Sequence, residues 1–299
     1  EMLLGALAFI MMYANMCPRS HASPAPNPRS CLNKIYAVGR VHKKSGFQMA
    51  PFTLAVRVMK GMLHKYVEDN GVECLVPARK CPLTHALIDA MCTAPEGAAR
   101  AGSTLRVAWG TPFWVAVRAT FMVLAETGMR KADVSKATRS TPFKKGRLTF
   151  ASVVWRIGGE RVPSPSAAQL ATLGQHAGDG CWLVFGALKN DPFGEYFGAK
   201  PAWLPFSALA TRNAARGLAE LERLALAAGC TGEQRAATPL FGPCVGEEWH
   251  HSAIEEIFDF LLEVGGGLRL LAERRQYSLH SFRIHLACAL YAAKCPNDR

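Results

Sequence analysis

Apolar residues recur at helical spacing through the first third of the chain, and turn-forming residues separate the runs. Three helices are predicted on this pattern, over residues 27–46, 51–71 and 82–94. The first run shows the spacing at Leu32, Ile35, Val38 and Val41. Thr84 stands where the third helix begins and suits the N-cap position. Because Lys and Arg punctuate the first two helices, we predict a small, basic, helical domain over residues 1–93.

The pattern changes after residue 93. Residues 94–110 are rich in Ala, Gly and small polar residues without a sustained period, which indicates a linker. The apolar run that follows predicts a buried helix over 111–128. Strands are predicted over residues 147–157, 181–188 and 201–206, and further helices over 206–229, 250–266 and 278–294. A mixed domain over 111–299 follows, so the fold class is mainly α with a small antiparallel β-sheet (α+β).

The first fifteen residues are apolar enough to suggest a signal peptide or an anchor. They have no basic residue ahead of the apolar run and are fewer than the roughly 20 that span a bilayer. Glu1 also stands where an initiator Met is expected. We interpret the segment as a helix cut off at its start, and expect an incomplete N-terminus and no membrane partner.

The net charge of the chain indicates a class of binding partner. Lys and Arg number 35 against 23 Asp and Glu, which gives a formal net charge of +12. The field of such a protein attracts polyanions, so nucleic acid is the first partner to consider. A basic protein with no particular partner is the alternative, because charge alone does not separate the two.

Cysteine and histidine patterns do not predict a metal or a cofactor. The ten cysteines are Cys17, Cys31, Cys74, Cys81, Cys92, Cys181, Cys230, Cys244, Cys288 and Cys295. They contain no C-x-x-C pair, and disulfide frameworks belong to small secreted domains, so we predict reduced, mostly buried thiols. His250 and His251 fall in the first turn of a predicted helix without other ligands at metal spacing. The glycine-rich segment 263–269 lacks the Lys of a phosphate loop.

The six tryptophans lie in apolar stretches. They are Trp109, Trp114, Trp155, Trp182, Trp203 and Trp249. We expect them in the core rather than in a platform that stacks on bases.

Four basic or imidazole residues stand out by their positions in the sequence, and an acid lies near one of them. Arg130 follows the end of a predicted helix, and Asp133 lies three residues later on the same helical face. Lys189 comes directly after a predicted strand and before an Asn-Asp-Pro turn. His280 and Arg283 share one face at the start of the last helix.

The four basic or imidazole side chains form a phosphate pocket if the fold brings them together. Guanidinium groups suit a phosphodiester because they are planar, permanently charged and able to bind two oxygens at once. A His adds a donor or a proton shuttle near neutral pH, and a Lys on a flexible hairpin can protonate a leaving oxygen. Simpler interpretations are a surface Arg paired with Asp133, an ordinary hairpin Lys and a chance His-x-x-Arg.

Three segments resemble the tyrosine recombinase, or phage integrase, family of DNA breaking and rejoining enzymes. "LAETGMRKADV" is similar to the first catalytic block of the family, a Thr-Gly-x-Arg turn followed by an acid. "SLHSFRIHLACAL" resembles the second block, a His-x-x-Arg at the start of a helix. "LKNDPFGEYFGAKPAWLPF" resembles the hairpin that carries the catalytic Lys. The order of the segments agrees as well, and the resemblance covers residues 27–299.

The resemblance implies a clamp around double-stranded DNA. Residues 1–93 would form the helical core-binding domain and 111–299 the mixed catalytic domain. Homo-oligomers on DNA and an intracellular location would follow, in the nucleus of a eukaryote or in the cytoplasm or nucleoid of a bacterium.

The resemblance also implies roles for the five residues. In this family a Tyr attacks the scissile phosphate, giving a 3′-phosphotyrosyl link and a free 5′-hydroxyl. By motif match, the residues that bind the phosphate would be Arg130, His280 and Arg283. Lys189 would protonate the leaving hydroxyl, and Asp133 would orient its neighbours.

The sequence departs from the family pattern after the second block. The family's Tyr lies a few dozen residues beyond His-x-x-Arg, whereas this chain ends at Arg299, sixteen residues after Arg283. Tyr291 falls in that interval, about 12 Å along the same helix, and we interpret it as a core residue. We therefore expect a truncated C-terminus and no nucleophile in the chain.

Three functions remain for comparison. The first is a DNA-binding, integrase-like tyrosine recombinase that is inactive as this fragment. The second is a non-catalytic DNA-binding remnant of a mobile element, and the third is a helical scaffold whose basic surface is incidental. Salt-dependent DNA binding separates the first two from the third.

Overall fold

The chain divides into two compact units, Glu1–Ala78 and Arg79–Arg299. The computed structural model describes residues 32–33, 35–37, 40, 44–46, 53–71, 80–137, 147–186, 200–210 and 212–294. In the first unit, helix α3 spans Thr53–Asn70 and is followed by Gly71, whose φ of 79° is left-handed. The helix predicted over 51–71 is thus confirmed, while the apolar first fifteen residues lie outside the described part.

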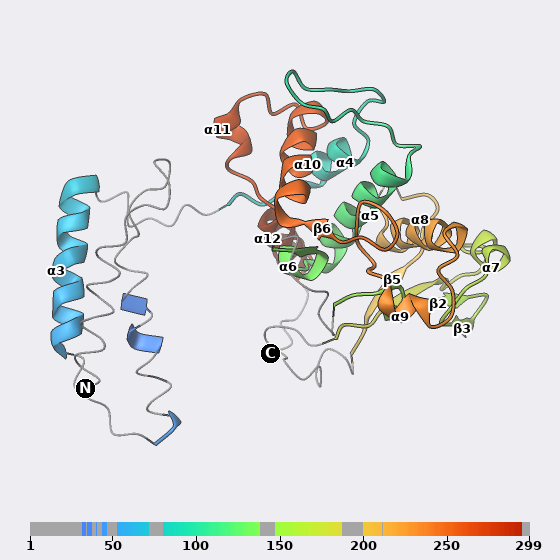
Figure 1. Cartoon of the computed structure of the whole chain (residues 1–299), viewed down its shortest axis with the longest axis horizontal. Coiled ribbons are helices and arrows are strands. Elements are labelled where there is room, and N and C mark those ends of the chain that lie inside the picture. The colour runs from blue at the N-terminus through green and yellow to red at the C-terminus, as the bar shows by residue number, and fades with distance from the viewer. Residues whose placement is uncertain are drawn as a thin grey trace. The chain divides into compact units, whose positions relative to one another are not determined.

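The second unit combines helices with a small sheet (Figure 1). Its helices are α4 (His85–Cys92), α5 (Pro112–Thr127), α6 (Lys131–Val134), α7 (Ala167–Ala171), α8 (Ala214–Ala227), α9 (Gln234–Ala237), α10 (His251–Val264), α11 (Leu271–Arg274) and α12 (His280–Ala292). Its strands are β1 (Ser135–Lys136), β2 (Val153–Ile157), β3 (Glu160–Val162), β4 (Gly180–Leu183), β5 (Ala202–Pro205) and β6 (Trp249–His250). The predicted fold class, mainly α with a small antiparallel β-sheet, is confirmed. No helix in the described residues is long and apolar enough to cross a membrane.

Four strands form an antiparallel sheet in the order β3-β2-β4-β5. β2 and β5 lie within segments whose patterns predict strands, and β4 begins one residue before its predicted segment 181–188. The first residues of the segment 147–157 do not join the sheet, and Phe150–Ser152 form a 3₁₀ turn. The pattern does not predict β3. Its pairing with β2 needs a two-residue turn at Gly158 and Gly159, with φ of 61° and 87°. Two adjacent glycines were the available signal, because such turns need positive φ at both positions.

α5 is the central helix of the second unit and packs against α8 and α12. The contact with α8 is close, since a Cβ added to Gly217 would lie 3.0 Å from the Cα of Ala119. α8 begins later than residue 206, where the pattern places its start. Asn213 caps it by accepting a hydrogen bond from the backbone N–H of Arg216 at 2.9 Å.

The boundary between the units differs from the predicted one at residue 93. α4, capped by Thr84 as predicted, packs against α5 and α10 in the second unit. Residues 94–110 are an ordered loop of that unit, in which Trp109 Nε1 donates to the carbonyl of Ala94 at 2.7 Å. A helical pattern identifies the buried face of α4 but not the element that covers it, and so the sequence did not place the boundary.

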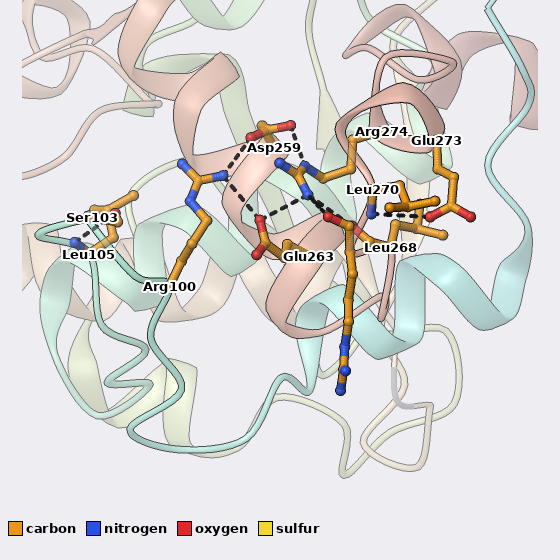
Figure 2. A network of polar contacts seen from close by, with 10 residues as sticks. Arg100, Ser103, Leu105, Asp259, Glu263, Leu268, Leu270, Glu273 and Arg274 are labelled. Atoms are coloured by element: carbon orange, nitrogen blue, oxygen red, sulfur yellow. Dashed lines mark hydrogen bonds and ion pairs between the residues drawn. The ribbon is translucent and has the colours of Figure 1, made fainter.

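Two arginines and two carboxylates join the 94–110 loop to α10 and α11 (Figure 2). Arg100 Nη1 lies 2.6 Å from Asp259 Oδ2, and Arg274 Nε donates to Asp259 Oδ1 at 2.8 Å. Glu263 Oε2 lies 3.5 Å from Arg100 Nη1 and 2.9 Å from Arg274 Nη1. Each carboxylate therefore contacts both arginines, which fixes the loop against α10.

A second ion pair is buried. Arg235 of α9 contacts Glu222 of α8, and their side chains are 3% and 1% exposed. Arg235 Nη2 also donates to the carbonyl of Phe150 at 2.9 Å, and Trp155 Nε1 donates to Glu222 Oε2 at 3.2 Å. The pair thus ties α8 and α9 to β2 and the turn before it.

The predictions for single aromatic residues and thiols hold only in part. Trp114, Trp155 and Trp249 are buried as expected, but Trp203 is 37% exposed. The core interpretation of Tyr291 is wrong, because this side chain is 86% exposed. The buried residues of α12 lie in its first half, and Leu290 and Tyr291 in its last turns are exposed.

The described cysteines are all free thiols. Three of them are buried, namely Cys92, Cys181 and Cys230, whereas Cys244 and Cys288 are exposed. Burial raises the pKa of Cys92 to about 12, so this thiol stays protonated at neutral pH.

Candidate functional site

The first predicted block forms a tight turn at the end of α5. Gly128 ends α5 with φ of 59°, and its N–H donates to the carbonyl of Leu124 at 2.9 Å. Arg130 then caps the short helix α6. Its N–H donates to Asp133 Oδ2 at 2.7 Å, while the N–H of Asp133 donates to the carbonyl of Arg130 at 2.9 Å. Asp133 therefore closes the turn that presents Arg130.

The second predicted block begins α12 and is anchored by Phe282. This ring is fully buried and lies 5.5 Å from Phe121 of α5 and 5.8 Å from Phe258 of α10, between ring centroids. His280 and Arg283 are exposed on the other side of the helix. The predicted common face of these two residues is consistent with this arrangement.

α12 is also held by the start of the second unit. His285 is buried and its Nδ1 lies 2.7 Å from the carbonyl of Leu83, so Nδ1–H must be the donor. Its ring meets that of His85 edge to face, with centroids 4.5 Å apart. Burial lowers the pKa of His285, which favours the neutral ring in this contact.

The two blocks lie against each other. A Cβ added to Gly128 would lie 2.9 Å from Leu286 Cδ2 and 3.7 Å from the Cα of Arg283. Arg130 is two residues beyond Gly128, so its Cα is within about 8 Å of that glycine. Extended arginine side chains reach across such separations. The turn that carries Arg130 thus packs on α12 at Arg283, although about 150 residues separate the two arginines in the chain.

Replacement of Gly128 by alanine is expected to destabilise the fold more than the same change at Gly232. Both residues are left-handed, with φ of 59° and 54°, but an added Cβ at Gly232 meets nothing within 4 Å. Gly232→Ala should cost about 1 kcal/mol for backbone strain. Gly128→Ala should cost about 1 kcal/mol more, since Leu286 must move. Urea denaturation measures both, and equal losses would show that α12 does not press on this turn.

Three side chains of the site are available to a ligand. Those of Arg130, His280 and Arg283 form no hydrogen bond or ion pair within the described part of the chain. The neighbouring Lys131 differs, because its Nζ lies 2.5 Å from Glu255 Oε1. The start of α12 adds the positive end of the helix dipole. This arrangement can hold an anion with oxygens in several directions.

A contact that the sequence did not predict lies beside this turn. β1 pairs in parallel with β6, with Ser135 opposite Trp249. Ser135 Oγ lies 2.7 Å from His251 Nδ1. Burial, followed by the charge of Lys131, lowers the pKa of His251. The sequence did place His250 and His251 at a helix start, which is confirmed, since α10 begins at His251.

A cavity of about 880 Å³ lies next to the parallel pair. Lys136 and His250 line it, and so do Glu247, Glu248 and Glu256. Its charges are mixed, so it does not extend the anion site. No group of three or more His, Cys, Asp or Glu that could hold a metal ion occurs in the described residues.

Lys189 lies outside the described residues. In the sequence it falls between β4 and β5, which are antiparallel neighbours with Gly180 opposite Pro205. Tyr291 is eight residues beyond Arg283 on α12, or about 12 Å along the helix axis. Of the five predicted residues, the structure therefore places four in one region.

Comparisons with protein-family models, with curated proteins and with solved structures give no match for this chain.

Proposed function

We propose that this protein binds duplex DNA as an integrase-like member of the tyrosine recombinase class. The observation that carries the proposal is the packing of Gly128 against α12 at Arg283. It brings a Thr-Gly-x-Arg turn beside the helix start that carries His-x-x-Arg, which supports a shared site for Arg130, His280 and Arg283. The net charge of +12 supports a polyanionic partner.

In this proposal each side chain has one task. Arg130 and Arg283 bind the non-bridging oxygens of a phosphodiester, since each guanidinium can donate to two oxygens. His280 adds a donor from the first turn of α12. Asp133 holds the backbone N–H of Arg130 at 2.7 Å and so keeps the turn closed. Lys189 is proposed as the proton donor to a leaving hydroxyl on the basis of the resemblance alone.

A second candidate function is DNA binding without a covalent step at Tyr291. A covalent step needs a nucleophile in line with the phosphate. Tyr291 lies about 12 Å along the same helix from Arg283 and is 86% exposed, so it does not reach a phosphate held there by its own chain. Both candidates use the same phosphate site, and they differ in whether a covalent adduct forms.

DNA affinity should depend on salt through these residues. Each lost phosphate contact reduces the slope of log K against log salt concentration by about 0.9. We expect Arg130→Ala and Arg283→Ala each to reduce the slope by about this amount and to weaken binding modestly, because the protein has many other cations. Fluorescence anisotropy of a labelled duplex over a salt series measures the slope.

Arg161→Ala is the matched control for this experiment. Arg161 is an exposed arginine of β3, outside both blocks, so its loss changes the net charge equally. A slope that falls as much with Arg161→Ala would mean general electrostatic attraction rather than a site. Binding that does not respond to salt in the unchanged protein would favour a scaffold with an incidental basic surface.

A further inference from the structure

The turn that presents Arg130 is too short to hold its own shape. α6 has four residues, Lys131–Val134, which is one helical turn. Isolated turns are unstable because the first hydrogen bond fixes several backbone dihedrals at once. Asp133 closes the turn from within, but contacts from other elements must fix its direction.

Those contacts come from the start of α10. Ser135, directly after α6, contacts His251 at 2.7 Å between Oγ and Nδ1. At the other end of α6, Lys131 pairs with Glu255 at 2.5 Å between Nζ and Oε1. His251 and Glu255 are one turn apart on α10, so one helical face holds both ends of α6.

This face of α10 is itself fixed to the core. Strand β6 directly precedes α10 and includes Trp249, whose side chain is 1% exposed. Trp249 Nε1 donates a hydrogen bond to Thr120 Oγ1 of α5 at 3.2 Å. A continuous path therefore runs from α5 through β6 and His251 to the turn of Arg130.

The hydrogen atoms in this path can be assigned. Ser135 Oγ also lies 2.7 Å from the carbonyl of Lys131, and a carbonyl can only accept. The hydroxyl has one hydrogen, which it donates to that carbonyl. His251 must therefore donate from Nδ1–H to Ser135 Oγ, and burial favours its neutral ring by lowering the pKa.

We propose that His251 is a positioning residue for Arg130, acting through Ser135 and α6 to aim the guanidinium at a bound phosphate. The inference rests on the proposed function, because it needs Arg130 to contact phosphate. Among the described residues His251 forms no hydrogen bond with the Arg130 side chain, so its role is indirect.

The test is a double-mutant comparison of salt slopes. Arg130→Ala should reduce the slope of log K against log salt by about 0.9. His251→Leu removes the donor but leaves Arg130 in place, and we expect the same reduction. The double variant should show no further reduction, because both changes remove one phosphate contact. His251→Asn, whose amide can replace the Nδ1–H donor, should restore most of the slope.

A second variant covers the case in which His251→Leu does not fold. Ser135→Ala removes the acceptor of the contact with a smaller change in volume, and it should give the slope of His251→Leu. Circular dichroism and urea denaturation confirm that each variant is folded at the assay temperature.

The outcomes separate the two proposals. If Arg130→Ala reduces the slope but His251→Leu and Ser135→Ala do not, the positioning role is wrong and the phosphate site stands. Additive reductions also overturn the positioning role, since His251 would then contact DNA by itself. If Arg130→Ala has no effect on the slope, the phosphate site is wrong and the inference that rests on it is wrong as well.

Discussion

Replacement of Arg235 by methionine is expected to lower the free energy of unfolding by about 3–5 kcal/mol. Glu222 would lose its ion-pair partner at a position where its side chain is 1% exposed, and among the described residues it would retain the hydrogen bond from Trp155. The carbonyl of Phe150 would also lose its hydrogen bond from the guanidinium. An unpaired charge in a low-dielectric interior is costly, and total stabilities are typically about 5–15 kcal/mol.

A double variant is the control for this prediction. Arg235→Met with Glu222→Leu removes both charges and replaces them with apolar side chains, so it should be more stable than Arg235→Met alone. Urea denaturation of the single and double variants measures the difference. The pair would be shown to contribute little if the single change cost under about 0.5 kcal/mol, as an ordinary surface substitution does.

The second large effect is expected from Phe282→Ala, at about 3–5 kcal/mol. Phe282 fills the junction of α5, α10 and α12, with aromatic contacts to Phe121 and Phe258. Removing the ring leaves a cavity that three packed helices can collapse only in part. Because Phe282 lies between His280 and Arg283 in the sequence, the same change should also loosen the end of α12 that carries them.

Leu290→Ala on the same helix is the matched control. Leu290 is 46% exposed, so its truncation should cost less than about 1 kcal/mol. Thermal or urea unfolding compares the two, with secondary structure followed by circular dichroism. Similar losses for both variants would mean that α12 is not anchored at Phe282.

Local signals account for the part of the fold that the sequence predicts. Thr84 and Gly128 mark helix ends by capping chemistry that acts within a few residues, and both ends are confirmed. The parallel pair of β1 and β6 has two residues in each strand, and its partners are more than a hundred positions apart. No periodic pattern exists in so short a strand, so only the folded structure shows it.

In the candidate site too, the sequence predicts what depends on local spacing and does not predict what depends on packing between distant elements. The closure of the Arg130 turn by Asp133 follows from a spacing of three residues, and it is present. The meeting of the two blocks depends on how α12 packs on α5, which spacing does not determine. The contact of Ser135 with His251 depends on the pairing of β1 with β6, which the sequence does not predict. From the sequence alone, His251 is therefore predicted only as a residue at the start of a helix. Lys189 stays a prediction.

α12 is held at one end, and this divides the helix into two parts of unequal local stability. Its first half carries the buried residues Ser281, Phe282 and His285, while Leu290 and Tyr291 are exposed in the last turns. The free energy needed to open backbone hydrogen bonds follows local burial. Opening and closing of the last turns therefore costs little and leaves the first turn in place. His280 and Arg283 lie in the first half of α12, which stays closed when the last turns open. Fraying at the far end of α12 therefore does not disturb the proposed phosphate site.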